Sequence, residues 1–184
     1  MTVRPATPDD AYPVAVLHVR AWRWAYAGIM PDETLAALDA DARAERRRGQ
    51  FADQSVFETL VAVDGAGIRG FASFGPYRMA RDRADVDGRY AEVYAIYVDP
   101  DHVGTGAGRA LMDAARARLA ERDFVEVRLW VLEANLRARR FYERYGFTLD
   151  TGPDGRALLA VERPGSGPVD LAELRYRAPA RTDG

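Results

Sequence analysis

The sequence predicts an α/β protein with three layers, α/β/α, in which helices cover both faces of a mixed, mostly antiparallel sheet of about seven strands. Strand-like residues 91–98 lead through a glycine-rich loop into a helical pattern at 108–121. Alternating residues 124–132 lead into a second helical pattern at 136–145. This repeated strand–helix order predicts two parallel strands, because a helical crossover lets the next strand run in the same direction. We expect these two strands to splay apart.

The N-terminal half supplies two more helices and an antiparallel meander. The expected elements are a strand at 2–6, a helix from about 7 to 27, a helix at 32–49, strands at 56–63 and 68–76, and a loop at 78–90. The sequence Asp64-Gly65-Ala66-Gly67 between the two strands is typical of a hairpin turn. The loop is rich in Arg, Asp and Gly.

The C-terminal part closes the predicted domain. Asn135 is suited to cap the helix at 136–145, and Gly146 is suited to end it. Short strands are expected at 147–149, 157–161 and 171–177, with a loop at 164–168. A chain of 184 residues fits one domain, which we place at residues 1–177. Residues 178–184 are expected to form a disordered tail.

The loop Pro100–Gly108 contains glycine at positions 104, 106 and 108, directly before a helix. Backbone amides without side chains, together with the positive end of the helix dipole, favour a phosphate or pyrophosphate. The spacing fits neither the G-x-G-x-x-G dinucleotide motif nor a P-loop, because the required glycine and the Gly-Lys-Ser/Thr tripeptide are missing. The alternative is a tight turn with no ligand.

Composition excludes several classes of function. The formal net charge of −2 lacks the positive excess that is typical of nucleic-acid-binding proteins. No apolar run is long enough to span a membrane. The chain has no cysteine and two histidines without metal-site spacing, so we expect no thiol nucleophile and no metal. No G-x-S-x-G motif is present. Direct transfer without a covalent enzyme intermediate remains, in a protein that we expect in the cytoplasm.

Two stretches resemble the GNAT superfamily of acyl-CoA-dependent N-acetyltransferases. They are VYAIYVDPDHVGTGAGRALM and RLWVLEANLRARRFYERYGF, and the likeness is close over residues 91–148. It implies a GNAT-like acyl-CoA N-acyltransferase fold, acetyl-CoA as co-substrate, and direct attack by a small-molecule or peptide amine. Family members often form homodimers. The alternatives are a non-catalytic acyl-CoA-binding module and an acyltransferase that uses a hydroxyl acceptor or a longer acyl donor.

The resemblance also implies which residues bind coenzyme A. Backbone amides of the glycine loop take the pyrophosphate, the strand before it pairs with pantetheine, and a backbone amide near Tyr97 or Val98 stabilises the developing oxyanion. The cofactor-binding set is Ile96, Tyr97, Val98, Val103, Gly104, Thr105, Gly106, Ala107, Gly108, Arg109, Asn135, Arg139 and Tyr142. Val103 departs from the family pattern, which usually has Gln or Arg at this position. We expect binding to survive because the amides are unchanged.

The resemblance assigns chemistry to two further side chains. Tyr142 occupies the position of a general acid, and a phenol is protonated at neutral pH. Glu92 matches a general base, and strand alternation places it on one face with Tyr94 and Ile96. Core packing is the alternative role for Tyr142, and a surface carboxylate is the alternative for Glu92.

The acceptor is expected to bind among aromatic side chains near the end of the first helix and the loop at 78–90. These residues are Trp22, Trp24, Tyr26, Tyr77 and Tyr94. Aromatic rings attract cationic amines. The alternative is that these rings pack the first two helices together.

Overall fold

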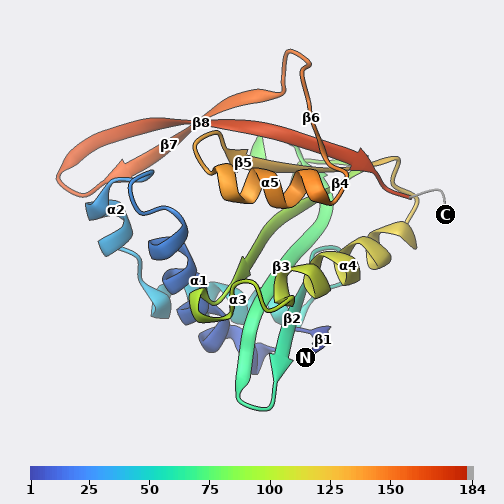
Figure 1. The fold of residues 1–184 in the computed structure, drawn as a ribbon, viewed down its shortest axis with the longest axis horizontal. Helices are drawn as coiled ribbons and strands as arrows, with labels where there is room; N and C mark the ends of the chain where they lie inside the picture. Colours follow the sequence, from blue (N-terminus) through green and yellow to red (C-terminus); the bar gives the residue numbers. More distant parts are fainter. Residues whose placement is uncertain (182–184) are drawn as a thin grey trace.

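A computed structural model describes residues 1–181, which form one eight-stranded mixed sheet with helices on both faces (Figure 1). The strands are β1 (Thr2–Pro5), β2 (Glu58–Asp64), β3 (Gly67–Arg78), β4 (Val86–Val98), β5 (Glu126–Leu132), β6 (Thr148–Leu149), β7 (Arg156–Arg163) and β8 (Ser166–Pro179). Their order is β1-β2-β3-β4-β5-β8-β6, and β7 pairs with β8. The predicted fold class is therefore confirmed.

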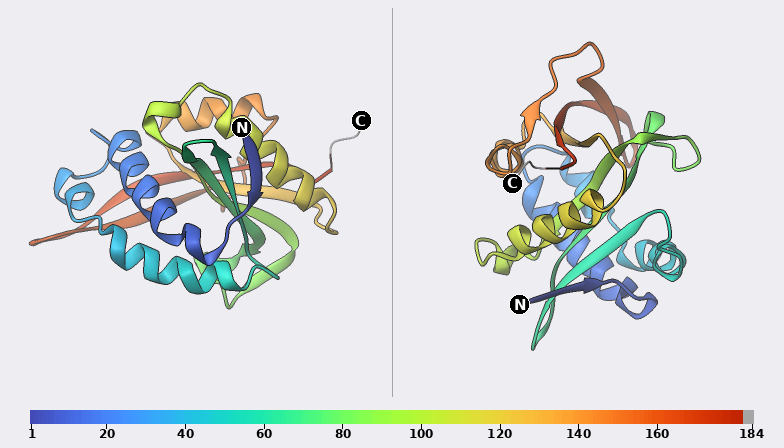
Figure 2. Two further views of the ribbon diagram at one scale, coloured as in Figure 1. Left: turned by 90° about the horizontal axis from the view of Figure 1, so that it is seen from below. Right: turned by 90° about the vertical axis from the view of Figure 1, so that its right-hand side faces the viewer.

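The helices form two layers around this sheet. They are α1 (Ala11–Ala25), α2 (Asp32–Ala36), α3 (Ala40–Ala52), α4 (Ala107–Ala120) and α5 (Leu136–Arg144), with 3₁₀ turns η1 (Pro8–Asp10), η2 (Met79–Arg81) and η3 (Pro100–His102). The left view of Figure 2 shows α1 and α3 on one side of the sheet and α4 on the other. Buried apolar residues follow the same division, with Leu111 and Leu119 of α4 in one cluster and Val14 and Leu17 of α1 in the other.

The parallel strands β4 and β5 separate after a short contact. Only Tyr90, Ala91 and Glu92 pair with β5, although β4 continues to Val98 and β5 continues to Leu132. The predicted splay is therefore confirmed. Beyond Glu92, the β4 edge that faces β5 has no partner strand within residues 1–181.

A β-bulge in β4 lies just past the point of separation. Ser73 pairs with Ala95 and Phe74 pairs with Val93, so Tyr94 is the extra residue. The bulge reverses the alternation of the strand. Val93 lies in the α4-side cluster, and after the bulge it is Ile96 that packs against this cluster. The prediction that Glu92, Tyr94 and Ile96 share one face is thus wrong, because uninterrupted alternation does not hold across a bulge.

The predicted helix at 32–49 is in fact two helices. Asp39 has an extended backbone, with φ −107° and ψ 120°, and its carboxylate accepts hydrogen bonds from the amides of Asp41 and Ala42. Asp39 is thus an N-cap that starts α3. The predicted loop at 78–90 is also shorter, since β3 runs to Arg78 and β4 begins at Val86.

Residues 178–180 contradict the expectation of a tail over 178–184. β8 continues to Pro179, Ala178 pairs with Val127, and the amide of Ala180 donates to Val125 O at 3.2 Å. Ala178 and Ala180 are both buried. Small apolar residues near a chain end look like a tail in the sequence, whereas here they complete the core beside β5. Residues 182–184 lie outside the described part.

The strands β7 and β8 form an arm that extends beyond β5 and lies over α2 (Figure 1). Val161 of the arm, Leu35 of α2 and Met30 form a third apolar cluster with Leu132 of β5. The arm therefore covers the end of the gap between β4 and β5. Within residues 1–181, the helices are all too short or too polar to cross a membrane.

Truncation after Arg177 tests the order of the C-terminal segment. It removes the pairing of Ala178, the Ala180 hydrogen bond and two buried side chains, so we expect a loss of about 2–4 kcal/mol of unfolding free energy. Truncation after Arg181 keeps these contacts and serves as the control. Thermal or urea unfolding of both proteins measures the difference, and equal stability of the two would contradict the burial of this segment.

Candidate active site

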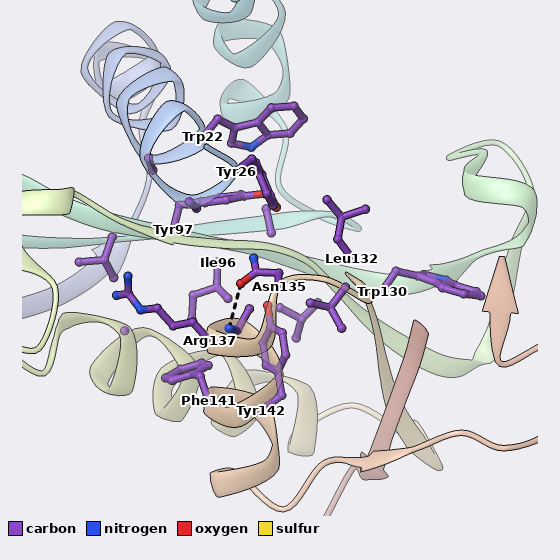
Figure 3. Close-up of a pocket in the computed structure, with 18 of the residues that line it drawn as sticks. Trp22, Tyr26, Ile96, Tyr97, Trp130, Leu132, Asn135, Arg137, Phe141 and Tyr142 are labelled. Atoms are coloured by element: carbon purple, nitrogen blue, oxygen red, sulfur yellow. Dashed lines mark hydrogen bonds between the residues drawn. The ribbon is translucent and has the colours of Figure 1, made fainter. Parts of the chain in front are cut away.

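A cavity of about 890 Å³ opens where β4 and β5 separate. β4 supplies its floor, the loop before α4 and helix α5 supply one end, and α1, β5 and the arm supply the other (Figure 3). Of the residues predicted to form the site, these line the cavity: Trp22, Trp24, Tyr26, Glu92, Tyr94, Ile96, Tyr97, Val98, Val103, Gly104, Gly106, Gly108, Arg109, Asn135 and Tyr142.

The glycine loop exposes free backbone amides at one end of the cavity. Gly104 and Gly106 have φ values of +86° and +94°, a region that other residues rarely adopt. A Cβ built at either position would meet no atom within 4 Å. Gly106 caps α4, whose first amides have no acceptor inside the helix. The loop therefore presents an open cradle of N–H groups at the positive end of a helix dipole.

One predicted member of the loop, Thr105, does not fit this cradle, and Ala107 can contribute only its backbone amide. The amide of Thr105 donates to His102 O at 3.3 Å, and its hydroxyl donates to the same oxygen at 2.7 Å. Ala107 points into the core, where it is buried. Only the helix-start amide of Ala107 remains available, because its side chain packs away from the cavity.

Three arginines line the cavity near this loop, namely Arg109 of α4 and Arg137 and Arg144 of α5. Arg137 lies over the ring of Trp24, with 3.9 Å from its guanidinium carbon to the ring centroid. Arg139 does not join them, contrary to the prediction. Its Nε donates to Tyr176 Oη at 3.1 Å and its Nη1 to Glu133 O at 3.0 Å. The helical rotation from 137 to 139 turns Arg139 toward β8 instead.

Asn135 forms the predicted helix cap and also borders the cavity. Its Oδ1 accepts a hydrogen bond from the amide of Ala138 at 3.1 Å, shown as the dashed line in Figure 3. The capping bond uses the side-chain oxygen, so the amide nitrogen remains a donor. Asn135 can therefore cap the helix and still donate a hydrogen bond to coenzyme A.

Tyr142 projects from α5 into the middle of the cavity (Figure 3). Its ring packs against Phe141 and Phe147, and the residue is buried. Within residues 1–181 its hydroxyl makes no hydrogen bond to another protein group, although it borders the cavity. Burial raises the pKa of Tyr142 above its usual value, and the nearby Tyr97 adds to this effect. The phenol is therefore a proton donor that stays protonated at neutral pH.

Glu92 is buried and held by one partner. Its carboxylate accepts from Arg78 Nη2 at 2.7 Å, from Arg78 Nε at 3.1 Å and from the Arg78 backbone amide at 3.1 Å. Glu92 is therefore not the surface carboxylate that was its alternative role, and its carboxylate is not free to accept a proton as a general base. A proton taken by Glu92 would disrupt a bidentate ion pair.

Aromatic rings from α1 and β4 form one wall of the cavity. The hydroxyls of Tyr26 and Tyr97 are 2.9 Å apart, and Trp22 packs edge-on against Tyr26 with ring centroids 5.3 Å apart. Tyr94 lines the cavity and donates to Pro76 O. Tyr77 does not reach it, contrary to the prediction.

Tyr77 lies outside the cavity because β3 continues as a strand where the sequence suggested a loop. Its hydroxyl accepts from Arg175 Nη1 at 3.2 Å, and its ring lies 5.0 Å from the Arg128 guanidinium. The residue is thus buried between basic side chains of β5 and β8.

A second, mostly charged group of residues that is not predicted from the sequence lies at the end of the cavity away from the glycine loop. This group consists of Arg78, Arg81, Trp130 and Glu173. The basic composition of residues 78–90 was a signal for the two arginines. Nothing local marks Glu173, which reaches the cavity only because β8 pairs beside β5. The described residues contain no cluster of three or more His, Asp or Glu able to hold a metal ion.

Comparison with known proteins places this arrangement in a family. Residues 17–147 match the Acetyltransferase (GNAT) family. The uncharacterized N-acetyltransferase YuaI of Bacillus subtilis is 34% identical over 146 residues, which cover 79% of each chain. Mycothiol acetyltransferase of Salinispora arenicola is 37% identical over 78% of this chain, but this chain covers only 42% of its length.

Solved structures show the same fold at lower identity. PaiA N-acetyltransferase of Thermoplasma acidophilum, in complex with coenzyme A, has a TM-score of 0.70 and 18% identity over 96% of this chain and all of its own. The Salmonella typhimurium protein yncA, with its cofactor acetyl-CoA, has a TM-score of 0.69 and 19% identity over the whole of this chain and 96% of its own. The match over residues 17–147 and the 34% identity to YuaI establish that the chain belongs to the acetyltransferase (GNAT) family.

Proposed function

We propose that this protein transfers an acetyl group from acetyl-CoA to an amine by direct attack. The observation that carries the proposal is the cavity itself, which joins a cradle of free amides, an unpaired strand edge and the Tyr142 hydroxyl in one space. These are the parts needed to hold a diphosphate, an extended thioester arm and a departing thiolate. Cytoplasmic location and homodimer formation stay predictions.

The residues present fit coenzyme A from its phosphates inward. Free amides from Gly104, Gly106 and the start of α4 suit the pyrophosphate. Arg137 and Arg144 add positive charge beside them, and the cavity lining as a whole holds five arginines and two glutamates. The unpaired edge of β4 from Ile96 to Val98 suits pantetheine, whose amides would bond to it as an added strand does.

In this proposal the acetyl transfer takes place in the middle of the cavity. A neutral amine attacks the thioester carbon, a backbone amide of β4 stabilises the oxyanion, and the C–S bond breaks as the carbonyl re-forms. Tyr142 gives its proton to the leaving sulfur, the nitrogen releases one proton to solvent, and the phenolate takes up a proton from solvent before the next turnover. Because Arg78 occupies the Glu92 carboxylate, we assign Glu92 a part in fixing this wall and propose that the amine loses its ammonium proton to solvent, not to Glu92, before it attacks.

Replacement of Gly106 by Asp tests the cradle. The new carboxylate would occupy the open space at Gly106 and repel the diphosphate, so we expect about 10²-fold weaker binding of coenzyme A. Gly165→Asp is the matched control, because Gly165 also has a positive φ and open space but lies in the β7–β8 turn. Isothermal titration with coenzyme A measures both. Unchanged affinity in Gly106→Asp would refute the loop assignment.

Replacement of Tyr142 by Phe tests the general acid. We expect kcat to fall about 10²-fold while the KM for acetyl-CoA changes less than about twofold, because the ring and its packing remain. Tyr90→Phe is the control, since Tyr90 lies outside the cavity. Coenzyme A release with a panel of amines provides the assay. Binding of coenzyme A without turnover of any amine would instead support the non-catalytic binding module.

The raised pKa of Tyr142 leads to a pH prediction. The phenol stays protonated up to about pH 10, so kcat/KM should rise as the amine loses its proton and then remain level. Tyr142→Phe should show the same rise at lower rates. A decline below about pH 10 in the wild type that is absent from Tyr142→Phe would show that the phenol ionises earlier than its burial implies.

A further inference from the structure

The end of the cavity away from the glycine loop contains two ion pairs, each with a buried glutamate, that the proposed reaction does not use. Arg78 pairs with Glu92, and Arg81 pairs with Glu173. All four residues line the cavity, and both glutamates are buried. The charges balance at this end, whereas the end near the glycine loop has three arginines. The balanced end is therefore the place for the acceptor, away from the phosphates.

The two pairs differ in how firmly they are held. Arg78 makes three hydrogen bonds to Glu92 and lies over Tyr94, with its guanidinium carbon 4.2 Å from the ring centroid. Arg81 contacts Glu173 through Nη2, its side chain is 38% exposed, and it lies 5.6 Å from the Trp130 centroid. Arg81 is thus the cation that a ligand can reach.

The backbone around Arg81 supports a functional role. Ala80 and Arg81 have φ values of +45° and +64°, and no other non-glycine residues among those described have positive φ. Such strain persists where surrounding structure holds a side chain in a required position. Here it directs Arg81 across the cavity from the β3–β4 turn to β8.

Glu173, by contrast, is fixed at a junction of strands. It pairs with Leu132 of β5 on one side and with Ala157 of β7 on the other. The carboxylate therefore cannot follow Arg81 if the turn at 79–85 moves. Separation of the pair would leave a buried anion and a free guanidinium facing the same space, and each would need a partner.

We propose that the acceptor is an amine that carries a carboxylate and an apolar body, as an α-amino acid does, and that Arg81 binds this carboxylate. This inference rests on the proposed function. The ligand carboxylate takes the place of Glu173 on Arg81, and Glu173 then faces the ligand ammonium before it loses its proton. Each charge in the pair regains a partner of opposite sign.

The charge of this end of the cavity and its apolar lining argue against a polyamine. Both carboxylates already face guanidinium groups, so a polycation would meet two like charges and gain no free anion. Apolar side chains complete the wall and suit the body of the acceptor; they are Met30, Trp130, Leu132 and Leu159.

The test measures acceptor binding to the full chain saturated with coenzyme A. The probes are leucine, methionine, phenylalanine, tyrosine and tryptophan, each against its primary carboxamide, which keeps the amine and side chain but lacks the carboxylate. Proteins are the wild type, Arg81→Met and the control Arg83→Met, which changes an arginine of the same turn that lies outside the cavity. Titration calorimetry gives affinities, and release of coenzyme A from acetyl-CoA is assayed in parallel.

We expect at least one amino acid to bind 10-fold or more tightly than its carboxamide, and this preference to disappear in Arg81→Met but not in Arg83→Met. Equal affinity within every pair, a preference that survives in Arg81→Met, or no binding of any amino acid in the panel would overturn the proposal. The calorimetric affinities are measured with coenzyme A, so they do not depend on turnover. A protein that binds as expected yet releases no coenzyme A would therefore contradict the proposed function and leave this inference supported.

Discussion

The separation of β4 from β5 is the constraint on which the rest of the structure depends. Three paired residues, Tyr90 to Glu92, hold the strands together, and the bulge at Tyr94 follows at once. A sheet that stayed closed would leave no cavity, and its backbone groups would be satisfied within the protein. Because the strands diverge, the β4 edge stays available and the space beside it is lined by α1, α5 and the arm.

The two ends of this space differ in charge for reasons that lie in the fold. Helix α4 begins at the mouth of the gap, so its free amides and dipole join Arg137 and Arg144 at one end. At the other end, Arg81 of the β3–β4 turn pairs with Glu173 of β8 across the gap, and Arg78 of β3 pairs with Glu92 of the neighbouring β4. A long, polyanionic co-substrate and a small acceptor that carries one positive and one negative charge thus have separate places. Tyr142 lies between them.

Much of this could be predicted from the sequence, because the signals are local. The glycine spacing, the strand alternation and the cap at Asn135 depend on residues near one another, and they predict the strand order around the gap and nearly half of its lining. Features set by tertiary contact could not be predicted. The bulge at Tyr94 is visible only in its register with β3, and the direction of Arg139 depends on Tyr176 and Glu133.

The same distinction explains the remaining errors. The sequence predicts Tyr77 at the acceptor site because the basic segment after it is typical of a loop, whereas pairing with β4 carries β3 past Tyr77. Glu173 lies 81 positions after Glu92 in the chain and meets the cavity through strand pairing alone. The end of β8 looked like a tail because Ala178 and Ala180 gain their burial only beside β5.

Residue-resolved amide hydrogen exchange, measured with and without coenzyme A, tests the central claim most directly. If the ligand occupies the gap and completes the free edge of β4, exchange should slow together at residues 95–98 and at residues 104–109, while the hairpin turn at 64–67 stays unchanged. Exchange that slows elsewhere, or slows in the glycine loop without any change along β4, would contradict the account of the gap as the site of the thioester arm.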